Sequence, residues 1–139
     1  MNDGGPRLVI DTSVSFKWYM QDGEQGVAPA WELLERHRSG EVPLAAPEHM
    51  RLELLNALKS RRCKEAELLD ASDHLELARL QWHPVDAQLA RAAGSIAAQY
   101  GLTLYDAAFA ALAVELDCEL VTADRRLASC GACHARLLG

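Results

Sequence analysis

The amino-acid sequence predicts one α/β domain, a three-layer α/β/α sandwich with a short central parallel sheet. Short apolar runs rich in β-branched residues alternate along the chain with longer segments of helical periodicity. This alternation is typical of βαβ units. The chain has 139 residues, of which half are hydrophobic, and this is enough for one buried core. Neither a repeat nor a linker divides it, so we expect a single domain over residues 1–139, with residues 1–6 as a flexible leader.

In the first half of the chain, strands are expected at two short apolar runs, and helices at the longer segments around them. The run RLVI is β-branched, and VPLAAP is bounded by prolines. Gly40 marks the end of one helix, because glycine commonly follows a helix C-terminus. The expected elements are a strand at 7–10, helices at 13–20 and 27–38, a strand at 42–47, and helices at 48–62 and 65–80.

The second half continues the same alternation. Asp86 is a suitable N-cap for a helix, and Gly101 is a suitable end for it. The segment CELVTAD contains the clearest strand pattern in this half. The expected elements are a short strand at 82–85, helices at 86–100 and 105–117, a strand at 118–124, a short helical turn, and a last strand at 135–138.

Four acidic residues occur in similar settings along the chain. Asp11 directly follows the first strand, and Asp124 ends the segment CELVTAD. Asp106 is the single charge near the start of an apolar, alanine-rich helix, and Glu53 lies on the polar stripe of a mostly apolar helix. Ligands of open parallel sheets bind outside the carboxyl ends of the strands. We therefore expect these acids to lie close together at one edge of the sheet.

Each acid also has a purely structural interpretation. Aspartate is a favourable helix N-cap, so Asp11 and Asp124 could each serve as caps. Asp106 follows Thr103 with the spacing of a capping box. Glu53 could instead pair with Arg51, Lys59 or another cation. These explanations are independent of one another, whereas a shared site explains all four acids together.

Clustered carboxylates repel one another unless they are protonated or bridged by cations. The candidate cluster offers oxygen ligands and no convergent histidine. This donor set suits Mg²⁺ or Mn²⁺ and does not suit zinc. The sequence therefore predicts a magnesium or manganese site formed by Asp11, Glu53, Asp106 and Asp124.

Four segments resemble, in order and spacing, the motifs of PIN-domain ribonucleases, and most closely those of VapC-type toxins from type II toxin–antitoxin systems. The resemblance spans roughly residues 7–138, nearly the whole chain. Each motif alone is weak, but the ordered set is specific. The segments are VIDTSV, the pattern P-x5-E-x2-N-A-L beginning at Pro47, LTLYDAAFAALA and LVTADRRL.

The resemblance implies a Mg²⁺- or Mn²⁺-dependent endoribonuclease that hydrolyses RNA phosphodiester bonds with these acids. It also implies a homodimer that is held by a cognate antitoxin. The alternative is a PIN-like scaffold that binds RNA or protein without cleaving, although four intact acids favour the enzyme. The positions that match the family's polar supporting residues are Thr12, Ser13, Asn56 and Thr122.

The cationic residues offer several candidates for substrate contacts. Arg125 and Arg126 follow one of the acids and are possible contacts to an RNA backbone. Arg61 and Arg62 occur where a helix C-terminus favours positive charge, and we prefer that role for them. The net charge of −6 argues against a broad basic face that binds nucleic acid without sequence preference. It does not exclude a nucleic-acid enzyme, because a bound metal offsets several carboxylates locally.

The segment CGACH, residues 130–134, has the spacing of a haem-attachment motif and also contains a possible redox or zinc pair. The chain has no apolar run long enough to cross a bilayer and no secretory leader pattern. We therefore expect no membrane association, a cytoplasmic location and reduced cysteines. Under these conditions, the motif is expected to be a loop before the last strand.

Overall fold

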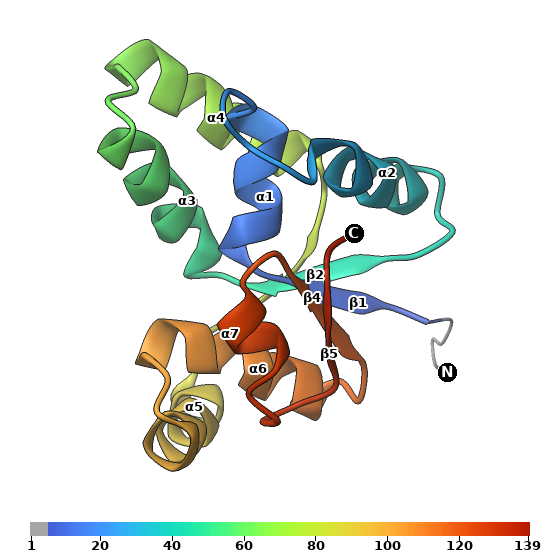
Figure 1. The fold of residues 1–139 in the computed structure, drawn as a ribbon, viewed down its shortest axis with the longest axis vertical. Helices are drawn as coiled ribbons and strands as arrows, with labels where there is room; N and C mark the ends of the chain where they lie inside the picture. Colours follow the sequence, from blue (N-terminus) through green and yellow to red (C-terminus); the bar gives the residue numbers. More distant parts are fainter. Residues whose placement is uncertain (1–5) are drawn as a thin grey trace.

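The computed structural model describes residues 6–139. The predicted leader lies outside this range except for Pro6. Within it, five parallel strands form one sheet in the order β3-β2-β1-β4-β5, with helices on both faces (Figure 1). The α/β/α sandwich predicted from the sequence is therefore confirmed. The strands are β1 Leu8–Ile10, β2 Leu44–Pro47, β3 Gln81–His83, β4 Glu119–Thr122 and β5 Ala135–Leu137.

The central strand β1 connects distant parts of the chain. Leu8 is paired with Leu44 of β2 on one side, and Ile10 is paired with Val121 of β4 on the other. β1 and β2 are buried along their whole length, because helices cover both faces of the sheet. This register brings the ends of β1 and β4 to the same edge.

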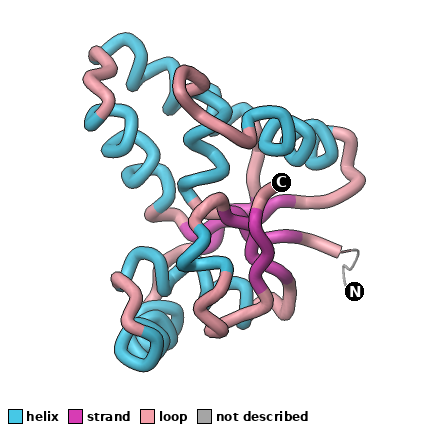
Figure 2. Tube along the Cα trace, in the orientation of Figure 1, coloured by secondary structure: helices cyan, strands magenta, loops and turns pink. Residues whose placement is uncertain are grey.

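Helices α1 to α4 lie on one face of the sheet, and α5 and α6 lie on the other, with the short α7 beside β4 and β5 (Figures 1 and 2). In α6, every residue from Ala107 to Ala113 is buried. Its alanines allow this helix to approach the sheet closely. The helices are α1 Thr12–Tyr19, α2 Val27–Arg38, α3 Met50–Ser60, α4 Glu65–Leu77, α5 Ala87–Tyr100, α6 Leu104–Glu115 and α7 Arg125–Ala128.

Two of the predicted boundaries differ from the structure for identifiable reasons. The third strand, expected at 82–85, ends at His83 because Pro84 has no N–H group to continue the ladder. The helix expected at 65–80 ends at Leu77, and Arg79 takes a positive φ of 54° that a helix cannot continue. Asp86 caps α5 as expected, through its contact with the Leu89 N–H.

The segment CGACH forms a loop between α7 and β5, as expected, and all four cysteines are free thiols. None of the helices in residues 6–139 is long and apolar enough to span a membrane.

Candidate active site

The four predicted acids line one pocket of about 280 Å³ at the carboxyl edge of the sheet. Asp11 follows β1, and Asp124 follows β4. Asp106 comes from the first turn of α6, and Glu53 comes from the first turn of α3. The structure therefore brings together four segments that are far apart in the sequence. The other residues that line this acidic pocket are Thr12, Ser13, Asn56, Ala57 and Phe109.

Asp11 is held at the base of the pocket by two hydroxyl groups. Its Oδ1 accepts a hydrogen bond of 2.5 Å from Ser13, and its Oδ2 accepts one of 2.6 Å from Thr122. The same two hydroxyls accept hydrogen bonds from the N–H groups of Ala123 and Asp124. Asp11 is at the N-cap position of α1, but its side chain makes no capping hydrogen bond. The capping interpretation is therefore wrong for this residue.

Burial and neighbouring charge act on the acids of the pocket. The pKa of Asp11 is raised from 3.8 to about 6, chiefly because burial disfavours its charged form. The hydrogen bonds from Ser13 and Thr122 lower this pKa, and the charge of Asp106 raises it. The pKa of Asp106 is also raised, first by burial and then by the charge of Asp124. The acids thus destabilise one another's charged forms.

Glu53 is oriented from two sides. The Thr12 hydroxyl donates a hydrogen bond of 2.7 Å to its Oε1, and His49 Nε2 lies 3.9 Å from the same oxygen. The predicted alternative of a pair between Glu53 and Arg51 is wrong. Arg51 pairs instead with Glu76.

Sequence reasoning missed His49. Its ring packs against Phe109, with the centroids 4.7 Å apart, and Nε2 donates to the carbonyl of Tyr105 at 3.2 Å. The available signal was its position four residues before Glu53, which places both side chains on one side of α3. Among the described residues, its Nδ1 is the buried side-chain atom that lacks a hydrogen-bond partner.

The two remaining acids differ in their capping roles. Asp124 Oδ1 accepts hydrogen bonds from the N–H groups of Arg126 and Leu127, so it caps α7 and also lines the pocket. Asp106 is not a cap, because the hydroxyl of Thr103 caps α6 by accepting from the Asp106 N–H at 3.1 Å. The carboxylate of Asp106 therefore remains available to the pocket.

The candidate RNA-contacting arginines lie beside this edge. Arg125 and Arg126 begin α7, immediately after Asp124, and both are exposed. The guanidinium of Arg126 donates to the Gly101 carbonyl, and its charge lowers the pKa of Asp106. Arg126 is thus held near the pocket, at the C-terminal end of α5.

The donor chemistry of the pocket fits a hard divalent cation. Mg²⁺ and Mn²⁺ prefer carboxylate oxygens, and a bound cation would offset the repulsion that raises the pKa of Asp106. Within residues 6–139, however, no three Asp, Glu, His or Cys side chains are already close enough together to hold a metal ion. The acids share a pocket without forming such a three-ligand group, and Mg²⁺ commonly binds through one or two carboxylates with water in its remaining positions.

A comparison with models of protein families shows to which family the chain belongs. The model of the PIN domain matches residues 8–131, which include all four acids. The chain belongs to the PIN domain family. The predicted family resemblance is thereby confirmed, and the acidic edge of this PIN domain lies within the matched region. A comparison with curated protein sequences gives no match.

Solved structures with the same fold include chains from toxin–antitoxin complexes. A chain of VapBC2 from Rickettsia felis, bound to a DNA fragment from the promoter, matches with a TM-score of 0.70 and 16% identity, covering 96% of this chain and 99% of that one. VapC20 from Mycobacterium tuberculosis, described as a sarcin-ricin loop cleaving toxin, matches with a TM-score of 0.69 and 18% identity. The match covers 89% of this chain and 95% of VapC20. A chain of DNA-bound VapBC from Salmonella typhimurium matches with a TM-score of 0.68 and 16% identity. The match covers 97% of this chain and 100% of the Salmonella chain.

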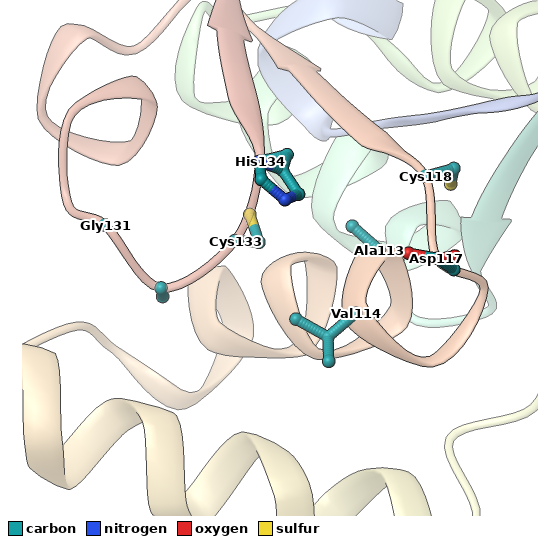
Figure 3. Close-up of a pocket in the computed structure, with 8 residues that line it drawn as sticks. Ala113, Val114, Asp117, Cys118, Gly131, Cys133 and His134 are labelled. Carbon is teal, nitrogen blue, oxygen red and sulfur yellow. The ribbon is translucent and has the colours of Figure 1, made fainter.

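The cysteine motif lines a separate pocket of about 400 Å³, formed by the C-terminal end of α6, the start of β4 and the loop before β5 (Figure 3). Cys118, Cys133 and His134 contribute to it. Burial raises the pKa of Cys133 to about 11 and also raises that of Cys118. These thiols are therefore protonated near neutral pH and are poor nucleophiles.

Proposed function

We propose that this PIN domain is a Mg²⁺- or Mn²⁺-dependent endoribonuclease and the toxin component of a type II toxin–antitoxin system. The observation that supports this proposal best is the convergence of Asp11, Glu53, Asp106 and Asp124 in one pocket. VapC20 provides independent support for RNA as the substrate, because it shares the fold and cleaves the sarcin-ricin loop.

In the proposed reaction, the acids hold the cation and the hydroxyls orient the acids. Asp11 and Asp106 are the principal ligands, with help from Glu53 and Asp124. A bound Mg²⁺ or Mn²⁺ ion supplies Lewis acidity toward a phosphate oxygen and lowers the pKa of water. Each of the supporting residues then has a specific position. Ser13 and Thr122 orient Asp11, Thr12 orients Glu53, and Asn56 lines the acidic pocket.

Asp11 has to be ionised to act as a ligand. Its pKa of about 6 in the metal-free protein means that protons compete with the cation below neutral pH. Cation binding and cleavage are therefore expected to weaken together as the pH falls through this value.

The proposed partners are a cognate antitoxin and a second copy of this chain. The Rickettsia felis and Salmonella typhimurium structures are VapBC complexes, and this supports an antitoxin for the present chain. An antitoxin segment is expected to cross the acidic pocket and to place a basic side chain among the carboxylates, because such a pocket attracts any mobile cation. The homodimer is supported by the family resemblance. Of the aromatic side chains of the first half, Trp18 is buried in the core of the domain, whereas Tyr19 and Trp31 are only partly buried and remain candidates for the interface.

The proposal is tested by cleavage of single-stranded RNA, tRNA and rRNA with Mg²⁺ or Mn²⁺ and with a chelator. The wild-type protein is expected to cleave at least one of these RNAs only when the cation is present, and Asp11→Asn is expected to be inactive. Asp86→Asn is the matched control, because Asp86 caps α5 away from the acidic pocket and asparagine preserves a cap. Cation-independent binding of RNA without cleavage would instead identify the scaffold.

A further inference from the structure

A second pocket, here called the flanking pocket, adjoins the acidic pocket beside α1 and the end of α3. It has a volume of about 530 Å³, and the two pockets share Thr12, Ser13, Ala57 and Asp124. An RNA strand whose scissile phosphate lies among the acids can therefore extend directly into the flanking pocket. The side chains found only in the flanking pocket include Phe16, Lys17, Glu24, Ser60 and Arg61.

Two cations meet one carboxylate in the flanking pocket. Lys17 Nζ lies 2.7 Å from Glu24 Oε1, and Arg61 Nη2 lies 3.0 Å from Glu24 Oε2. The Lys17 side chain is only 9% exposed, so its ammonium group must keep a partner. The Arg61 side chain is 47% exposed, whereas that of Glu24 is 16% exposed, so water reaches the guanidinium side of this pair and weakens it. Arg61 can therefore exchange its partner, whereas Lys17 remains paired with Glu24.

The side chain of Arg61 does not adopt the role that the sequence favours. Instead of turning toward the C-terminal carbonyls of α3, its guanidinium lies 5.1 Å from the centroid of the Phe16 ring and contacts Glu24. Guanidinium has five N–H donors in a planar fork that matches a phosphate group. Stacking on Phe16 holds this fork in the flanking pocket while leaving donors available.

We propose that the flanking pocket binds the RNA phosphate next to the scissile one through Arg61, and that Glu24 competes with this phosphate for the same guanidinium. This inference rests on the proposed function, because it takes RNA as the substrate of the acidic pocket. Arg61 is then a substrate-positioning residue. Glu24 lies in the loop between α1 and α2 and acts as the internal competitor of the phosphate.

The experiment uses two matched pairs of variants. The first pair alters the flanking pocket and consists of Glu24→Gln and Arg61→Gln. The control pair alters another surface ion pair and consists of Glu119→Gln and Arg136→Gln. Both ion pairs have a length of 3.0 Å, and Glu119 is the first residue of β4. Each pair makes the same changes in net charge. Binding of a labelled single-stranded RNA is measured by fluorescence anisotropy with Ca²⁺ at several KCl concentrations. The kcat and KM of cleavage are measured with Mn²⁺.

Arg61→Gln is expected to weaken RNA binding about threefold to tenfold, to raise KM by a similar factor and to leave kcat unchanged. The slope of log affinity against log salt should become shallower by about 0.7, the value for one phosphate contact on a single strand. Glu24→Gln is expected to tighten binding several-fold, because Arg61 loses its competitor and Lys17 loses the carboxylate that neutralises it. The Glu119 and Arg136 variants are expected to behave as the wild type.

Several results would overturn the flanking-pocket proposal. One is an Arg61→Gln protein with the same affinity and salt slope as Arg136→Gln. Another is an Arg61→Gln protein that binds RNA as the wild type does but binds a glutamate-rich peptide more weakly than the wild type. That result would assign the pocket to an acidic protein segment. Wild-type protein that binds no RNA overturns it as well. Wild-type protein that binds RNA in an Arg61-dependent manner, yet does not cleave it with Mn²⁺, contradicts the proposed function and leaves the flanking pocket supported.

Discussion

The acidic pocket and the cysteine pocket lie at opposite ends of β4, and both contain residues that the sequence analysis singled out. The acidic pocket is built from four segments, and hydroxyl groups orient two of its carboxylates. The cysteine pocket is built from two segments, residues 113–118 and 131–134, and burial keeps the thiols of Cys118 and Cys133 protonated. The structure thus brings together the four predicted acids from distant segments, whereas the CGACH motif was selected only by spacing within one short segment, and we expect the acidic pocket to be the functional one.

The largest expected effect comes from removing one charge of the acidic pocket. Asp106→Asn should cleave RNA orders of magnitude more slowly, yet be at least as stable as the wild type without metal, because it relieves like-charge repulsion. The wild type should gain about 2.7 kcal/mol in unfolding free energy at a hundredfold excess of cation over the dissociation constant, and the variant much less. Thermal melts with and without Mn²⁺, together with a cleavage assay, provide the measurement. A destabilised variant with normal activity and an unchanged response to Mn²⁺ would falsify the site.

The second prediction concerns the pH dependence of the metal-free protein. The pKa of Asp11 is near 3.8 in the unfolded chain and about 6 in the folded one, so the folded state binds the proton more tightly. The unfolding free energy should therefore decrease by about 3 kcal/mol as the pH rises from below 4 to above 6. Urea titrations of the wild type and Asp11→Asn in a chelator measure this difference. An identical pH dependence of the two proteins would contradict the assigned cause.

The third prediction concerns the hydroxyl groups that orient Asp11. Thr122→Val keeps the shape of a fully buried side chain but removes the 2.6 Å hydrogen bond to Asp11 Oδ2. Cation affinity or cleavage should fall about 10- to 100-fold, as for other residues that orient metal ligands. Calorimetric titration with Mn²⁺ and a cleavage assay measure these losses. Ser39→Ala, which removes a hydroxyl at the end of α2, is the control, and equal behaviour of the two variants would contradict the role of Thr122.

The smallest effect is expected in the cysteine pocket. Replacing Cys130 and Cys133 with serine should leave cleavage unchanged, because neither residue lines the acidic pocket. Any stabilisation by zinc is expected to be the same in the wild type and the double variant, because burial raises the pKa of the Cys133 thiol and makes it a poor metal ligand. Cleavage assays and melting curves with Zn²⁺ test both points. A loss of cleavage in the double variant would contradict the expectation that cleavage depends on the acidic pocket and not on the cysteine pocket.

The sequence was sufficient to predict the fold and the convergence of the acids, because both depend on regular patterns. Parallel strands place Asp11 and Asp124 at one edge, and the alternation of strands and helices establishes that the strands are parallel. The boundaries of the third strand and of α4 were less predictable. They depend on Pro84 and on the positive φ of Arg79, which are single-residue effects within otherwise regular segments.

The partners of individual side chains could not be predicted. His49 lies near Glu53 because the two residues are four positions apart along one helix, but its contacts with Phe109 and with the Tyr105 carbonyl depend on tertiary packing. Likewise, Glu24 and Arg61 are distant in sequence, and their contact depends on the path of the loop after α1. Capping was only partly predictable as well. Asp124 is both a cap and a pocket residue, whereas Asp106 leaves the cap to Thr103.

The hydrogen bond between Thr122 and Asp11 joins residues that are 111 positions apart. During translation, Asp11 leaves the ribosome long before Thr122 is synthesised, and the central strand has no β4 beside it until then. A truncated product that stops before β4 contains Asp11, Glu53 and Asp106 but lacks the Thr122 hydrogen bond to Asp11 and the fourth acid. The proposed nuclease activity is therefore expected to begin only when synthesis of the domain is nearly complete.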